Sequence, residues 1–240
     1  MAGMNNKGSL FVLFTKHKTE TKEDVRALRT APFYKNLDFA MTTRKSIKGT
    51  QTEKNICISY LNECQSYARY NFYAKAADKE KLFPVGVVFR ETANNEIHHG
   101  KVFLKMLKDT EVVTPISVDA GYLGKTEENL KLSMKEEMEG GYEFYMACAA
   151  TADKEGFPEI ASHFKAIAEV EKFHYERFDK FLKMIKDGTL WKRDKEVTWK
   201  CLVCGYTYVG KEPPEVCPGC DHPTSHYICM EDGYCEVETL

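Results

Sequence analysis

The feature that most constrains this chain is a glutamate in the middle of each of four apolar helical seams. From about Gln51 to Asp187, apolar residues recur at intervals of three and four, the period of amphipathic helices, and strand patterns are nearly absent. Four helices of roughly 25–30 residues each are predicted, about 40 Å long at 1.5 Å per residue, which is typical of a bundle. The predicted breaks are Asp78–Pro84, Asp109–Gly124, Gly156–Pro158 and Asp187–Thr189.

The four glutamates belong to an ordered set of six polar residues. Along the chain, this set consists of Glu63, then Glu96 with His99, then Glu137, then Glu171 with His174. Burying an unpaired carboxylate costs several kcal/mol, so four of them need compensation, and two divalent cations supply it. One Glu from each of two helices plus Glu-x-x-His from each of the other two is the ligand set of di-iron and di-manganese bundles. The pattern therefore predicts a dinuclear metal site.

The period of three and four residues also predicts which side chains of the first and third helices face the interior of the bundle. In the first helix they are Ile56, Tyr60, Glu63, Tyr67, Tyr70 and Ala74. In the third helix they are Leu130, Met134, Glu137, Gly141, Phe144 and Cys148. Other acids of the third helix are expected to form a solvated stripe, namely Glu136, Glu139 and Glu143. His98 is rotated by about 100° from its neighbour on the helix and is expected to be peripheral.

Several tyrosines surround the predicted site in the sequence pattern. They are Tyr67, Tyr70, Tyr142 and Tyr145. One interpretation is core packing with a satisfied hydroxyl, and the other is a phenol bonded to a ligand carboxylate. The sequence leaves both open.

A second metal site is predicted near the C-terminus. Cys201 and Cys204 form one C-x-x-C turn, and Cys217 and Cys220 form another. Four thiolates in this arrangement hold one tetrahedral ion, either zinc or iron, and the spacing does not choose between them. A segment this short buries little core, so the metal should supply much of its folding free energy. The other C-terminal cysteines, Cys229 and Cys235, are expected to be incidental.

Taken together, these motifs make the chain resemble the rubrerythrin family over about residues 46–228. The phrases that carry the resemblance are Lys48–Asn55, Asn62–Tyr70, Glu91–His99, Lys154–Phe157, Glu171–His174 and the two cysteine turns that end in His222-Pro. The resemblance implies an all-α, ferritin-like four-helix bundle followed by a small rubredoxin-like domain. The expected division is an N-terminal extension over 1–45, the di-iron bundle over 46–190 and the four-cysteine iron domain over 196–240.

The resemblance also implies a function. A member of this family is expected to be a non-haem di-iron peroxidase that reduces hydrogen peroxide to water in oxidative-stress protection. Iron is expected in both sites, with zinc as a substitute in the four-cysteine site, and electrons would come through the four-cysteine iron from a reductase or rubredoxin. A homodimer or a higher oligomer is expected. The alternatives are a di-iron oxidase or ferroxidase acting on O₂ or Fe²⁺, a non-enzymatic iron-binding protein, and a structural zinc tail.

One position departs from the family pattern. Members usually carry a second glutamate three residues after the first in the third helix, which exchanges with the histidine of the second helix as one iron changes redox state. Here Glu137 is followed at that distance by Gly140 and then Gly141. Glu139 would take the place of the missing carboxylate only if the helix bulged locally, which a Gly-Gly pair permits.

Charge and hydropathy exclude some classes of partner. The net charge is −2, too close to neutral to indicate binding to nucleic acid or to an anionic membrane. No apolar run is long enough to span a bilayer. The resemblance to the family implies a cytoplasmic location. Residues 1–45 are expected to be a mobile extension, with an organellar targeting segment as the alternative.

Overall fold

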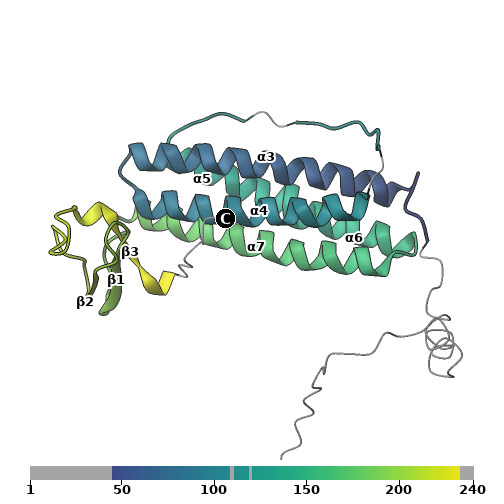
Figure 1. Ribbon diagram of the computed structural model, residues 1–240. Helices are drawn as coiled ribbons and strands as arrows, with labels where there is room; N and C mark the ends of the chain where they lie inside the picture. Colours follow the sequence, from purple (N-terminus) through teal and green to yellow (C-terminus); the bar gives the residue numbers. More distant parts are fainter. Residues whose placement is uncertain (1–44, 109–110, 119–120, 233–240) are drawn as a thin grey trace, which may run out of the picture. The chain divides into compact units, whose positions relative to one another are not determined.

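A computed structural model describes residues 45–108, 111–118 and 121–232 of the chain. Four long helical segments lie side by side (Figure 1). They are α3 (Gln51–Lys79), α4 (Phe83–Leu107), a composite third helix and α7 (Pro158–Lys186). The third helix consists of α5 (Thr126–Lys135), the π-helix η1 (Glu136–Glu143) and α6 (Phe144–Lys154). The predicted four-helix bundle is confirmed.

The helices begin and end where the sequence provides capping groups. The side chain of Thr50 accepts a hydrogen bond of 3.1 Å from the backbone N–H of Glu53 at the start of α3. The carboxylate of Glu155 accepts further bonds from the N–H groups of Gln51 and Thr52, at 3.1 and 2.8 Å. The chain turns between α6 and α7 at Gly156, whose φ of 80° is accessible to glycine at little cost. These contacts fix the ends of α3 and α7 at one end of the bundle.

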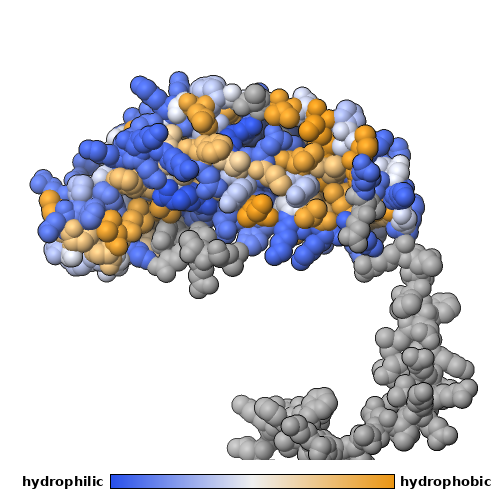
Figure 2. Space-filling model, turned by 45° about the horizontal axis from the view of Figure 1, so that its top comes forward, coloured by the Kyte–Doolittle hydropathy of each residue, from blue (hydrophilic) through white to orange (hydrophobic). Residues whose placement is uncertain are grey.

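A long connection links α4 to α5. Figure 1 shows that its described part runs along α3, from the end of α4 back to the start of α5. One crossover of this kind is the ferritin-like arrangement of a four-helix bundle. Figure 2 shows apolar residues gathered on the face of the molecule that includes this connection. The connection itself carries large exposed apolar side chains. They include Val113, Ile116, Val118 and Leu123.

The bundle interior contains two apolar clusters, one on each side of the six polar residues. One cluster includes Tyr70, Tyr73, Phe89, Phe178 and Phe181. The other includes Ile56, Phe103, Tyr145, Phe164 and Ile167. Burial of these large side chains supplies the main favourable term in folding. The carboxylates therefore lie between two packed cores, and the same packing holds the four helices in register.

The π-helix changes which residues of the third helix face inward. Glu137 and Gly141 are buried as expected, but the next fully buried position is Tyr145, and Phe144 is only partly buried. A π-helix changes the helical turn locally, so Tyr145 rather than Phe144 is the buried residue that follows it, while Cys148 is buried where the seam predicts. The prediction that Phe144 lies on the seam is therefore wrong by one residue. The prediction for Tyr67 is also wrong, because its side chain is exposed.

The C-terminal segment forms a small antiparallel sheet. Its strands are β1 (Val197–Cys201), β2 (Thr207–Gly210) and β3 (Tyr227–Cys229), in the order β2-β1-β3. Trp199 is fully buried at its centre, and its indole N–H donates to the carbonyl of Gly210 at 3.0 Å. The sheet and the two cysteine turns agree with the expected small C-terminal domain of the fold class.

Other expectations concern parts of the chain that lie outside the described residues. These are the mobile extension or targeting segment over 1–45, of which only the last residue is described, and the role of Cys235. The division into an extension, a bundle and a four-cysteine domain stays a prediction. None of the helices in the described part of the chain combines the length and apolarity needed to cross a bilayer.

Candidate metal centres

The six polar residues of the seams converge at the middle of the bundle, and we refer to them as the carboxylate cluster. Its members are Glu63, Glu96, His99, Glu137, Glu171 and His174. Each helix contributes, because the glutamates interrupt four seams that all face the same axis. The four glutamate side chains are at most 4% exposed, so bulk water does not compensate their charge.

The cluster divides into two groups of potential ligands that share two members. Glu63, Glu96, His99 and Glu171 form one group, in which all candidate ligand atoms lie within 4.8 Å of one another. Glu96, Glu137, Glu171 and His174 form the other group, with the same spacing. Glu96 and Glu171 belong to both groups. Their two carboxylates can therefore bridge two neighbouring cations, and each group adds one carboxylate and one imidazole.

Both imidazoles present Nδ1 to the shared carboxylates. Nδ1 of His99 lies 3.1 Å from Glu96 Oε2 and 3.2 Å from Glu171 Oε1. Nδ1 of His174 lies 2.9 Å from Glu171 Oε2 and 3.1 Å from Glu96 Oε1. Each shared carboxylate thus directs one oxygen toward each histidine. This arrangement is approximately twofold symmetric and is compatible with a pair of bridged metals.

The opposite nitrogen of His174 has a partner that the sequence pattern does not reveal. The side-chain amide of Asn95 on α4 lies 3.2 Å from His174 Nε2 on α7. When Nδ1 binds a cation, Nε2 carries the proton and can donate it to the amide oxygen of Asn95 after a half-turn of the amide. Asn95 therefore fixes the ring orientation of a potential ligand. Sequence reasoning missed it, because the contact depends on how α4 packs against α7.

The metal-free cluster shows where positive charge is needed. Glu96 Oε1 and Glu171 Oε1 are buried and accept no hydrogen bond of good geometry, although a histidine Nδ1 lies 3.1 Å from the first and 3.2 Å from the second. Burial raises the pKa of Glu63 and Glu137 well above the usual range, and the neighbouring carboxylates add to the effect. The carboxylates of Glu171 and Glu96 raise the pKa of His99 to about 9, although burial alone would lower it. All three pKa shifts favour the protonated form, because the cluster has an excess of negative charge. A pair of metal ions would neutralise this charge, so the residues fit such a pair.

Two tyrosines orient the outer carboxylates. The hydroxyl of Tyr70 donates to Glu137 Oε1 at 2.5 Å, and the hydroxyl of Tyr145 donates to Glu63 Oε1 at 2.6 Å. Both phenols are buried, and burial beside these carboxylates raises their pKa well above the usual value. Of the two interpretations left open for these tyrosines, the bond to a cluster carboxylate holds for Tyr70 and Tyr145. Tyr67 is exposed, and Tyr142 is partly buried against an apolar cluster.

The π-helix contains the position where the family pattern has another carboxylate. The local bulge that the Gly-Gly pair permits is present, yet the side chain of Glu139 is 62% exposed and lies 3.8 Å from Lys135. Glu139 is thus outside the cluster. A Cβ atom at Gly141 would lie 2.8 Å from the side chain of Glu171, so the close approach of the two helices requires glycine there. A Cβ atom at Gly140 would meet nothing within 4 Å.

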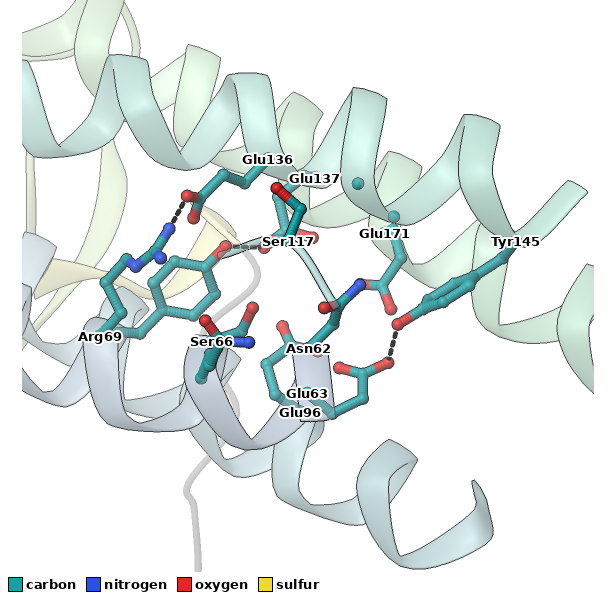
Figure 3. Close-up of a pocket in the computed structure, with 14 residues that line it drawn as sticks. Asn62, Glu63, Ser66, Arg69, Glu96, Ser117, Glu136, Glu137, Tyr145 and Glu171 are labelled. Carbon is teal, nitrogen blue, oxygen red and sulfur yellow. Dashed lines mark hydrogen bonds and ion pairs between the residues drawn. The ribbon is translucent and has the colours of Figure 1, made fainter. Parts of the chain in front are cut away.

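A cavity of about 210 Å³ lies against the cluster, between α3 and the π-helix (Figure 3). Glu136 lines it and forms an ion pair with Arg69. The expectation that Glu136 is solvated is therefore wrong, because its side chain is only 19% exposed. Glu143 is exposed as expected, and so is His98. The sequence contains no signal for the pairing with Arg69, since the two residues are brought together only by the packing of α3 on the third helix.

The four cysteines of the C-terminal turns also converge. Their Sγ atoms lie within 4.8 Å of one another, with Cys201 and Cys220 at 3.7 Å and Cys204 and Cys217 at 3.6 Å. A tetrahedral site with metal–sulfur bonds of about 2.3 Å has edges of about 3.8 Å, so the spacing fits one metal ion. The buried thiol of Cys229 is outside this group and donates to Glu231 at 3.2 Å.

Comparison with known proteins shows which family the chain is similar to. A family model described as rubrerythrin matches residues 54–182 and 128–203, and one described as the rubredoxin-like domain of rubrerythrin matches residues 199–228. A rubrerythrin of Porphyromonas gingivalis is 39% identical over 190 residues, which are 79% of this chain and 95% of the relative. A rubrerythrin of Clostridium perfringens is 39% identical over 194 residues, which are 79% of this chain and all of the relative.

Solved structures of nigerythrin share the fold. The partially reduced state aligns with a TM-score of 0.52 at 24% identity, over 79% of this chain and 91% of that one. The fully reduced, all-ferrous state gives the same values.

Proposed function

Because the chain belongs to the rubrerythrin family, we propose that it is a non-haem di-iron peroxidase that reduces hydrogen peroxide to water. As a family member it is a di-iron protein of the oxidoreductase type, with iron as its cofactor in the bundle and in the rubredoxin-like domain. We propose three further points: the peroxidase activity, the route of the electrons and the residues that bind the metals.

The sharing of Glu96 and Glu171 by two ligand groups is the observation that carries the proposal. In this proposal, Glu63, His99 and the two shared glutamates would hold one iron, and Glu137, His174 and the same two glutamates would hold the other. Cys201, Cys204, Cys217 and Cys220 hold the third. Two reduced irons bound there would supply the two electrons that cleavage of a peroxide O–O bond needs, and an iron held by the four cysteines would supply a one-electron donor for re-reduction.

The protein side chains do the remaining work. The hydroxyls of Tyr70 and Tyr145 hold Glu137 and Glu63 in place, and each keeps a proton at the edge of the site. Their raised pKa keeps both phenols protonated at neutral pH. Asn95 holds the ring of His174. The apolar clusters pack on either side of the site, so the cavity between α3 and the π-helix is the side from which a small molecule would reach it.

The proposed partners follow from the same assignment. They are hydrogen peroxide, a reductase or rubredoxin that donates electrons, and a second copy of the chain. The exposed apolar side chains of the connection, Val113, Ile116, Val118 and Leu123, support association, since exposed apolar patches often mark interfaces. Light scattering of the purified chain tests the homodimer.

Rapid mixing tests the activity directly. The anaerobically reduced protein is mixed with hydrogen peroxide and, separately, with O₂, while the visible spectrum is recorded. The proposal expects faster oxidation of the bundle iron by peroxide. Faster oxidation by O₂ would instead identify an oxidase or ferroxidase. A colourless protein with zinc in the four-cysteine site would remove the proposed electron route.

A further inference from the structure

The cavity beside the carboxylate cluster is larger than hydrogen peroxide needs. It has a volume of about 210 Å³, and Glu63, Glu96, Glu137 and Glu171 lie along its wall (Figure 3). A cavity of this size accommodates several water molecules. The cavity also extends beyond the carboxylates, because residues of α3 and of the π-helix outside the cluster line it, so space should remain there when two cations are bound.

Gly140 forms part of the wall of this remaining space. The residue is exposed, it lines the cavity, and a Cβ atom there would have no atom within 4 Å. Its neighbour Gly141 is the opposite case, because a Cβ atom there would collide with Glu171. The absence of a side chain at Gly140 is therefore not required by packing. It leaves a space that opens to the surface.

The rest of the outer wall suits an uncharged molecule. Arg69 lines the cavity, but its charge is matched by Glu136. Asn62, Ser66 and Ser117 are uncharged, and their side chains form no hydrogen bond to another described residue. An ion would find no unpaired counter-charge on this wall, whereas a neutral molecule with a hydroxyl or peroxy oxygen would find polar groups to bond with.

We propose that this cavity receives the organic part of small alkyl hydroperoxides, which the chain then reduces in addition to hydrogen peroxide. Gly140 sets the size limit for the alkyl group. The inference rests on the proposed function, which supplies two electrons from the reduced iron pair. The reaction is ROOH + 2 e⁻ + 2 H⁺ → ROH + H₂O. The O–O bond breaks, the peroxide is reduced, and the two protons end in the alcohol and in water.

The test compares two oxidants on matched variants. Reduced holoprotein is mixed with hydrogen peroxide and with tert-butyl hydroperoxide, and the ratio of the two rate constants is measured. The wild-type chain should oxidise with both. Gly140→Met should lower the ratio of tert-butyl hydroperoxide to hydrogen peroxide by about tenfold or more, the discrimination that shape exclusion gives in a pocket. Gly140→Ala should lower it less, and it places no atom in contact with a neighbour.

Glu139→Met is the matched control, because it adds the same side chain one residue away on the exposed face. Its ratio should equal that of the wild type. If the wild type reacts with hydrogen peroxide but not with tert-butyl hydroperoxide, the inference is overturned and the proposed function stands. If it reacts with neither peroxide, the proposed function itself fails. An equal ratio in Gly140→Met and wild type would also overturn the inference.

A second readout needs no turnover. The methyl resonance of tert-butyl alcohol, the product, is recorded by proton NMR in the presence of the iron-loaded protein. Binding beside the paramagnetic iron should broaden this line, and Gly140→Met should reduce the broadening while Glu139→Met should not. Equal line widths with all three proteins would show that the alkyl group does not enter the cavity.

Discussion

At the scale of single residues, the cluster combines groups that would be unstable alone. Four buried carboxylates and two imidazoles face one another. Glu96 keeps its charge, since the nearby His174 and His99 lower its pKa to about 2 despite its burial. The pKa of Glu63 is raised in the same cluster. The cluster is therefore a set of basic groups that can bind either protons or cations. The stability of the protein without metal should consequently depend on pH.

The stability of the metal-free protein should fall as the pH rises. The pKa of His99 is raised to about 9, and that of His174 is also raised. A raised pKa means that the folded state binds more protons, so its stabilising contribution is complete below about pH 6.5 and is lost toward pH 9. The raised pKa of Glu63 and Glu137 acts in the same direction, because folding then favours their neutral forms.

Urea unfolding of the metal-free protein at pH 6.5 and pH 9 measures this effect. The free energy of unfolding should be lower at pH 9, and loading with iron should reduce the difference, since cations replace the protons. A His99→Gln variant should show a smaller loss. A metal-free protein with the same stability at both values would contradict the linkage.

Asn95 should affect metal binding without being a ligand. Asn95→Ala removes the partner of His174 Nε2, so the affinity for the metal at the His174 side should fall by about 10–100-fold. Competition with a chelator during iron loading measures it. Asn94→Ala is the control, and it should leave the affinity unchanged. Equal affinities in the two variants would mean that Asn95 does not orient His174.

At the scale of elements, the sequence predicted where the helices lie along the chain better than it predicted which of their residues are buried. Apolar periodicity and the Pro158 and Gly188 signals located α7 and its end, because these effects act within one helix. The displacement from Phe144 to Tyr145 could not be read from the period, since a π-helix depends on how Gly141 packs against Glu171. Periodic patterns assume a constant number of residues per turn.

The two glycines of the π-helix should respond in opposite ways to alanine. Gly140→Ala meets no atom and reduces the freedom of the unfolded chain, so it should stabilise the protein by about 0.5–1 kcal/mol. Gly141→Ala forces a methyl group against Glu171 and should destabilise it by about 1–3 kcal/mol. Thermal unfolding of the two metal-free variants measures the contrast. Similar midpoints would show that the helices do not approach closely at Gly141.

At the scale of the whole molecule, the chain joins two metal sites of different chemistry. The sequence indicated both, because Glu-x-x-His and C-x-x-C place donor atoms close together within one helix or turn. It could not indicate the cavity, nor the pairs of Arg69 with Glu136 and Asn95 with His174, because these contacts arise from packing between helices. The positions of the ligands are thus predictable from the four seams and the local motifs, whereas individual contacts between other side chains of neighbouring helices are not.

The shared role of Glu96 and Glu171 is the central claim, and anomalous diffraction from crystals of the iron-loaded protein tests it most directly. Data collected at the iron edge should show two peaks in the bundle, roughly 3.5–4 Å apart, with both carboxylates between them, and one peak among the four cysteines. A single peak in the bundle, or two peaks that do not share Glu96 and Glu171, would contradict the account.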